Sequence, residues 1–267
     1  MVLTYNDRRR IMMGIIGRRR VSGGGELWTP AEISTVVWFD ASDTGTLWAD
    51  TGATTPATTS VARWDDKSGN TNHATQGTGS LQPVTGSATI GGLNAIRGVD
   101  GMQFMDVTNT PTVQSVFGVF NVSVNPGDLR NIINLGGNGS SPNSEVFVRY
   151  GGPQVSCDGQ GSAQGKYSLN GGADSGYAEN HTDTGISTGD NVIEVVQQNT
   201  LSLSVIIGRN GADVGPTDKC IVGEIVWCST ELDTSDKQKM EGYLAWKWGT
   251  ESKLPTGHPY ENGPPTV

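Results

Sequence analysis

The chain has 267 residues, of which 38 are glycine and 17% are charged, and its formal net charge is -9. This length allows one sizeable domain, and the acidic balance argues against a domain that holds nucleic acid on its own surface. Abundant glycine, threonine, serine and asparagine are typical of tight turns between short strands, so we expect an all-β fold.

The first 25 residues are predicted to form a basic N-terminal arm, followed by a single domain at 26–267. Residues 1–20 contain six arginines and one aspartate, a formal charge of +5 that leaves -14 for the remainder. Glycines at 23–25 indicate a flexible joint. We expect the arm to be disordered when free and to anchor the protein in a partner. The anchoring residues would be Arg8, Arg9, Arg10, Ile11, Met12, Met13, Ile15, Ile16, Arg18, Arg19 and Arg20.

Two alternatives for this arm stay open. The arm could instead be an ordinary solvated tail. Alternatively, its arginines could contact the phosphates of a packaged nucleic acid. The apolar run at 11–17 is seven residues long, which is too short to cross a bilayer, and no small-residue cleavage site follows it. We therefore expect no membrane segment and no signal peptide.

The three cysteines, Cys157, Cys220 and Cys228, are expected to be free thiols. An odd count gives no disulfide framework. The last two lie on one strand run, about 26 Å apart when extended, which is too far for a disulfide. Free, mostly buried thiols indicate assembly in a reducing cytoplasm.

The body of the chain contains repeated apolar runs separated by turn residues. The pair Asn199-Thr200 is predicted to be a hairpin turn between two of these runs. Runs at this spacing predict about a dozen strands, arranged as a two-sheet antiparallel sandwich. The runs are 33–39, 95–104, 113–124, 132–135, 146–150, 191–198, 201–207 and 221–228.

A strand and a helix close the chain. Residues 221–228 alternate, with Ile225 and Trp227 on one face and Val222 and Val226 on the other, so we expect a strand buried on both sides. A helix follows, with Ser235 and Gln238 as a capping box and Asp233 or Thr234 as rival caps. It should end at Gly249, before Pro255. Its apolar stripe is Met240, Tyr243, Leu244 and Trp248.

This C-terminal stretch resembles the end of concanavalin A-like (laminin G-like) jelly-roll domains, which are common in bacteriophage virion proteins and bacterial surface proteins. Two upstream segments, 38–43 and 64–70, agree with the resemblance, which covers roughly residues 30 to 260. It implies a jelly-roll sandwich with one short C-terminal helix. It is carried by Glu224, Ile225, Leu232, Glu241, Tyr243, Leu244, Ala245, Lys247, Trp248, Gly249, Leu254, Pro255, His258, Pro259 and Tyr260.

The sequence carries none of the common catalytic motifs. The paired-carboxylate strand motif of glucanases is missing, and Glu194 and Glu224 stand as single strand carboxylates. The sequence contains no G-x-S-x-G, H-E-x-x-H or P-loop pattern. His73, His181 and His258 have no partner spacing, and His258 is expected to make a structural hydrogen bond. We therefore predict that the chain is not an enzyme.

Two sets of residues are candidates for ligand contacts. Oxygen-bearing side chains on two loops could hold structural calcium, although turn formation explains them equally well; no other cofactor is expected. Aromatic residues in loops or off the helix stripe could stack on a sugar, or could simply cover a core edge. The calcium candidates are Asp40, Asp43, Asp65, Asp66, Asn70 and Asn72. The sugar candidates are Trp28, Trp48, Tyr167, Tyr177 and Trp246.

These observations predict a bacteriophage virion structural protein, assembled in the host cytoplasm. The arm would dock into other capsid or tail proteins, and the lectin-like jelly roll would hold host-surface polysaccharide weakly through several copies or a homo-oligomer. A free-standing carbohydrate-binding adhesin is the alternative, and a glycan-cleaving enzyme is less favoured. No membrane and no nucleic acid are expected as partners.

Overall fold

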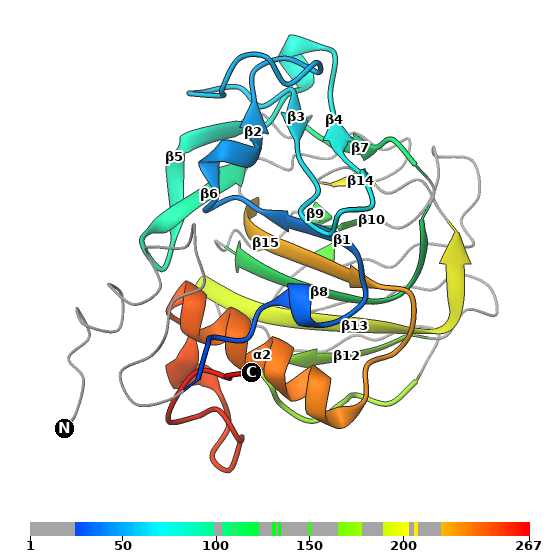
Figure 1. Ribbon diagram of the computed structural model, residues 1–267, viewed down its shortest axis with the longest axis vertical. Coiled ribbons are helices and arrows are strands. Elements are labelled where there is room, and N and C mark those ends of the chain that lie inside the picture. Colours follow the sequence, from blue (N-terminus) through cyan, green and yellow to red (C-terminus); the bar gives the residue numbers. More distant parts are fainter. Residues whose placement is uncertain are drawn as a thin grey trace.

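The computed structural model describes residues 25–98, 103–109, 111–122, 130–131, 133–134, 149–150, 165–177, 189–202, 206–207 and 220–267. Within these ranges the chain is mostly β, with two antiparallel sheets, a small two-stranded ladder and one α-helix. Figure 1 shows the smaller sheet at the top, the larger sheet in the middle and helix α2 across the lower front. The predicted N-terminal arm lies outside the described residues.

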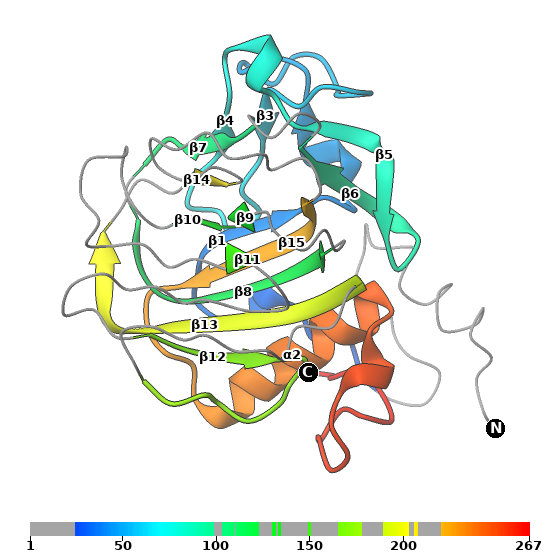
Figure 2. The same ribbon diagram turned by 180° about the vertical axis from the view of Figure 1, so that it is seen from behind.

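The larger sheet has seven strands in the order β12-β13-β8-β15-β6-β5, with β1 also paired to β15. Seen from behind, β15, β8, β13 and β12 follow one another toward α2 (Figure 2). The strands are β1 (Thr35–Asp40), β5 (Val84–Ile90), β6 (Leu93–Arg97), β8 (Thr112–Val122), β12 (Gly165–Leu169), β13 (Gly189–Ser202) and β15 (Cys220–Cys228).

The smaller sheet has six short strands in the order β10-β14-β7-β4-β3-β2. They are β2 (Leu47–Trp48), β3 (Arg63–Trp64), β4 (Ala74–Thr75), β7 (Met105–Val107), β10 (Ile133–Asn134) and β14 (Ile206–Ile207). The separate ladder pairs β9 (Arg130–Asn131) with β11 (Arg149–Tyr150). The helices are α2 (Thr234–Trp248) and four 3₁₀ turns, η1 (Pro30–Glu32), η2 (Thr44–Thr46), η3 (Gly79–Leu81) and η4 (Glu251–Lys253).

Two apolar cores hold these layers together. Phe39, Trp64 and Trp227 belong to the core between the two sheets. Phe117 and Trp248 belong to the core between the larger sheet and α2. The larger sheet is therefore apolar on both faces, as predicted for its central strand β15.

The strict alternation expected for β15 is broken at Gly223. The register against β8 shifts between Val222 and Glu224, so Val222 joins Ile225 in the core between the sheets instead of facing the helix. A Cβ on Gly223 would lie 2.9 Å from the ring of Trp248, so only glycine leaves room for that ring. The bulge thus aims the second half of the strand at the helix.

Helix α2 begins and ends close to the predicted residues. Asp233 is the N-cap and its Oδ1 accepts the backbone N–H of Asp236 at 2.9 Å, so the rival cap is correct and Ser235 is not the cap. Gly249 ends the helix in the left-handed conformation, as predicted. A Cβ on Gly242 would lie 2.7 Å from Tyr260, so this glycine lets the C-terminal tail pack on the helix.

One sequence expectation about turns is wrong. Strand β13 runs through Asn199-Thr200 and pairs with β8 on both sides of it, so a register shift stands where the hairpin was expected. A hairpin that the sequence analysis did not predict joins β5 and β6 through Gly91 and Gly92, both with positive φ. A Cβ on Gly91 would lie 2.0 Å from the carbonyl oxygen of Trp248, so the turn packs directly on the end of α2.

The two ends of the described domain meet. Leu27 forms a bridge with Thr266, and the backbone of Val267 donates to Glu26 at 2.9 Å. These bonds fix the point from which the N-terminal segment leaves the domain. None of the helices described is long and apolar enough to cross a membrane.

Candidate functional site

A buried carboxylate joins the larger sheet to helix α2. Glu224 on β15 is fully buried, and its Oε1 accepts from Trp38 Nε1 at 2.7 Å and from Tyr243 Oη at 2.9 Å. Its Oε2 accepts from Lys247 Nζ and Trp248 Nε1, each at 2.7 Å. Four of these five residues belong to the C-terminal motif that carries the family resemblance. The motif therefore builds a clamp between sheet and helix; we call it the Glu224 clamp.

The clamp continues into a line of alternating charges. Lys247 also reaches Asp40 Oδ2 at 2.8 Å, and Lys67 lies 3.0 Å from Asp40 and 2.8 Å from Asp43. Burial opposes ionisation of Asp40, but Lys247 and Lys67 together hold the pKa of that carboxyl below its usual range. Each buried charge is thus paired, which is the condition for burying ionised groups.

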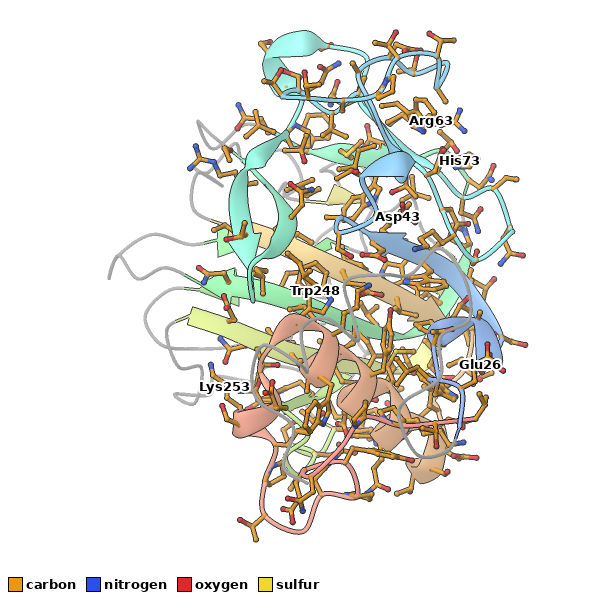
Figure 3. The ribbon with its side chains drawn as sticks, turned by 60° about the vertical axis from the view of Figure 1, so that its left-hand side comes forward. Glu26, Asp43, Arg63, His73, Trp248 and Lys253 are labelled. Atoms are coloured by element: carbon orange, nitrogen blue, oxygen red, sulfur yellow. The ribbon has the colours of Figure 1, made fainter. Side chains whose placement is uncertain are left out.

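The predicted calcium residues are engaged by protein donors. Asp66 accepts the backbone N–H of Trp38 at 2.9 Å and that of Asn72 at 3.0 Å. Asp65 lies between Arg63 at 2.7 Å and His73 at 3.0 Å, and Figure 3 shows the last two in the upper part of the molecule, away from Trp248.

The two asparagines among these candidates also bind the backbone. The side-chain amides of Asn70 and Asn72 both donate to the carbonyl of Val36. No group of three or more His, Cys, Asp or Glu side chains within the described residues is arranged to hold a metal. Protein contacts account for all six candidates, and the calcium site stays a prediction.

A second polar cluster lies where α2 crosses β12 and β13. Glu194 and Glu241 are both buried, and the hydroxyl of Ser168 is 3.0 Å from Glu194 Oε2 and 3.3 Å from Glu241 Oε1. Lys237 Nζ lies 2.5 Å from Glu194 and 3.9 Å from Glu241, and also contacts Asp174. We call Glu194 and Glu241 the buried acid pair.

Burial raises the pKa of each acid in this pair. It raises the pKa of Glu194 to about 7 although Lys237 opposes the shift, and it raises the pKa of Glu241 to about 7 as well. His258 completes the surroundings, since its Nδ1 accepts the backbone N–H of Tyr260 at 3.2 Å. The proton of the neutral ring then lies on Nε2 and points to Glu241 Oε2 at 3.3 Å. The structural role expected for His258 is confirmed.

The surface next to the buried acid pair carries an exposed aromatic ring. Tyr177 is 38% exposed, and its hydroxyl donates to Glu231 Oε2 at 2.9 Å. Lys166 Nζ lies 2.5 Å from Glu231, 2.7 Å from Asp174 and 5.3 Å from the centre of the Tyr177 ring. The backbone N–H of Glu231 donates to Gln114. We call Tyr177, Lys166, Asp174 and Glu231 the Tyr177 patch.

The other aromatic sugar candidates lie elsewhere. Trp28 and Tyr167 are buried in the two different cores, so their rings offer no open face. Trp48 and Trp246 are half-buried, with their indole N–H groups donating to Asp65 and to the carbonyl of Tyr260. The structure therefore does not gather the five candidates, and Tyr177 is the exposed one.

Most of the residues around Tyr177 were not predicted from the sequence to belong to a binding site. A signal was nevertheless present, because Glu194 and Glu241 sit at core-facing positions of apolar elements, where an acid requires a buried partner. Of the predicted thiols, Cys228 is free and buried, and burial raises its pKa to about 12. Cys157 lies outside the described residues.

The comparisons with known proteins give distant structural similarity only. No protein-family model matches the chain, and no curated protein matches it. A Trypanosoma rangeli sialidase aligns with 94% of this chain at 13% identity and a TM-score of 0.40. Its complex with 2,3-difluoro-KDN aligns with 93% at 11% identity and the same TM-score. Its complex with 2,3-difluorosialic acid, a covalent intermediate, aligns with 86% at 13% identity and a TM-score of 0.38.

These comparisons correct one expectation. The matched structures are sialidases, which are glycoside-cleaving enzymes, so the prediction that the chain is not an enzyme is withdrawn. The chain spans 36 to 38% of the length of these structures. At this TM-score and identity the similarity assigns no reaction to the chain.

Proposed function

We propose that the chain is a carbohydrate-binding sandwich of the concanavalin A-like jelly-roll class, that the Tyr177 patch is its sugar-contacting surface, and that it is displayed on a bacteriophage virion. The observation that carries the sugar-binding part is the exposed Tyr177 ring, set among charged side chains. Among the described residues, Tyr177 is the aromatic side chain with this exposure.

The chemistry of the patch suits a hydroxyl-rich ligand. An aromatic ring offers a flat apolar face to the C–H groups of a pyranose, while carboxylates accept hydrogen bonds from its hydroxyls. Asp174 and Glu231 are about one third and two fifths exposed, so their oxygens can reach a ligand. Lys166 holds both carboxylates in place before binding, which lowers the entropy lost when a sugar docks.

A binding experiment tests this site. The purified protein is screened on an array of bacterial surface polysaccharides and their oligosaccharides, and the strongest binder is titrated by calorimetry. We expect Tyr177→Ala to weaken binding about tenfold or more, as loss of one stacking anchor does. Tyr177→Phe keeps the ring and should weaken binding less. Mass analysis of the recovered oligosaccharide reports any cleavage in the same experiment.

A matched variant separates this surface from the other half-buried aromatics. Trp48→Ala removes a ring at the far end of the smaller sheet and should leave the affinity unchanged. If Trp48→Ala abolishes binding and Tyr177→Ala does not, the sugar site has been put on the wrong surface. If no glycan is retained by the wild-type protein, the carbohydrate-binding role is wrong.

The virion part of the proposal rests on the family resemblance and on the charge contrast between residues 1–20 and the rest. We expect a protein lacking residues 1–25 to fold with an unchanged melting temperature, because the contacts of Glu26 and Leu27 with the C-terminal residues remain. It should fail to join the virion. If it still decorates particles at full occupancy, the arm is not the anchor. A free-standing adhesin would instead bind glycan without being recovered on purified particles.

A further inference from the structure

The hydrogen bonds around the buried acid pair fit a state in which one of the two acids is protonated. The Ser168 hydroxyl contacts both acids but has a single hydrogen, so it donates to one carboxylate only. It can also accept from the second acid if that acid is protonated. The neutral ring of His258 already donates to Glu241 through Nε2. These hydrogen bonds are fully satisfied when Glu194 and Glu241 share one proton, and not when both are ionised.

The groups around the pair leave a negative balance when that proton is lost. From α2 the pair faces the cation Lys237, and Asp236 lies further along the same helix. From the loop after β12 it faces Asp174, from the C-terminal tail neutral His258, and from β15 the protonated thiol of Cys228. Lys237 would then be the cation paired with three ionised carboxylates, those of Asp174, Glu194 and Glu241, of which the last two are buried.

The same lysine links the pair to the surface. Lys237 contacts Asp174, which pairs with Lys166 at 2.7 Å, and Lys166 pairs with Glu231 at 2.5 Å. Glu231 holds the Tyr177 hydroxyl at 2.9 Å. An unbroken series of contacts therefore runs from the buried acid pair to the Tyr177 ring.

We propose that the Glu194–Glu241 pair acts as a proton switch for the Tyr177 patch, so that loss of its proton weakens glycan binding there. This inference rests on the proposed sugar-binding function. On deprotonation Lys237 moves toward the second buried carboxylate and away from Asp174. Asp174 then keeps only Lys166, and the segment at 172–177 that carries Tyr177 loosens. The burial of both acids places the switching range near pH 7.

Two measurements across pH 5.5 to 8.5 test the switch. The first is glycan affinity, which we expect to fall several-fold as pH rises. The second needs no ligand: hydrogen exchange of the backbone N–H of Ser175, which donates to Tyr167 at 2.9 Å, corrected for its intrinsic pH dependence. This exchange should accelerate above pH 7. Glu241→Gln mimics the protonated acid and should remove both effects, while the exposed control Glu32→Gln should keep them.

Each outcome supports or overturns the switch. If Glu241→Gln abolishes a pH-dependent exchange of the Ser175 N–H, the result supports the switch. If, in addition, no glycan binds, the sugar-binding proposal fails while the pH response of this segment stands. Exchange and affinity that stay constant from pH 5.5 to 8.5 overturn it. An equal pH dependence in wild type and Glu241→Gln also overturns it, because another group would then be the sensor.

Discussion

Replacing Glu224 by glutamine tests whether the buried clamp holds the fold together. The substitution keeps the side-chain shape but removes the charge and turns one oxygen into an NH₂ group. Its least costly orientation directs the NH₂ toward Tyr243, whose hydroxyl can accept instead of donate. Trp38 Nε1 then loses its acceptor. Lys247 loses one of its two ionic partners and keeps Asp40.

The expected cost follows from these two losses. A buried donor left without a partner costs about 1 to 3 kcal/mol. Breaking a buried ion pair costs about 3 to 5 kcal/mol, and less where a second carboxylate remains to neutralise the lysine. We therefore expect Glu224→Gln to lower the free energy of unfolding by about 3 kcal/mol. Lys247→Met should cost at least as much, because it leaves Glu224 and Asp40 without their shared cation.

Urea unfolding at pH 7, followed by tryptophan fluorescence, gives these values if the urea dependence is unchanged. The double variant should lose less than the sum of the two single losses, with a coupling of about 1 to 3 kcal/mol. Glu32→Gln, at an exposed site, is the control and should stay within about 0.5 kcal/mol of wild type. A Glu224→Gln protein as stable as the control would refute the structural role of the clamp.

Three further predictions concern stability. Trp248→Ala empties the centre of the core between sheet and helix and should cost about 3 to 5 kcal/mol in urea unfolding; an unchanged melting temperature would contradict the packing. Gly91→Ala places a Cβ against the carbonyl of Trp248 at a φ of 55°, and should cost about 1 to 3 kcal/mol, whereas a neutral result would show that the turn sits away from the helix. In the buried acid pair, Glu194 and Glu241 have folded pKa values of about 7 against 4.5 for the ordinary group, so the folded state binds more protons between these values. The resulting stability is present below pH 4.5 and is lost as pH rises through 7, and for one shared proton the free energy of unfolding should fall by about 3 kcal/mol. Glu241→Gln should remove most of this pH dependence, and a wild-type stability that rises over this range would contradict the assignment.

The elements that follow from the sequence are those with long, regular patterns. The apolar stripe of α2 and its glycine end were predicted correctly because apolar residues recur at helical spacing from Met240 to Trp248 and Gly249 follows them directly. The β5–β6 hairpin was missed although its Gly91-Gly92 pair is a favoured hairpin turn. Asn199-Thr200 was given a hairpin instead, because two apolar runs flank it. Only the pairing of β13 with β8 on both sides shows that one strand continues through this point, with a register shift between Val196 and Leu201.

The residues around the candidate site could not be found from local spacing. Tyr177 was among the sugar candidates, but its partner Glu231 lies 54 residues away and Lys166 is 65 residues from Glu231. Exposure separates Tyr177 from Tyr167, because the latter alternates inward on β12 while the former lies in the loop that follows. Both the contacts of Tyr177 and its exposure depend on how the strands pair, which cannot be deduced from any short sequence motif.

The family resemblance and the candidate binding surface use different residues. Glu224, Tyr243, Lys247 and Trp248 are enclosed, so changing any of them disturbs the join between sheet and helix before it alters a surface. Tyr177 lies outside that motif, in the loop that follows β12, and loops in general tolerate sequence change better than buried elements do. The same clamp can therefore support different loop surfaces, so the clamp residues by themselves do not specify what such a surface binds.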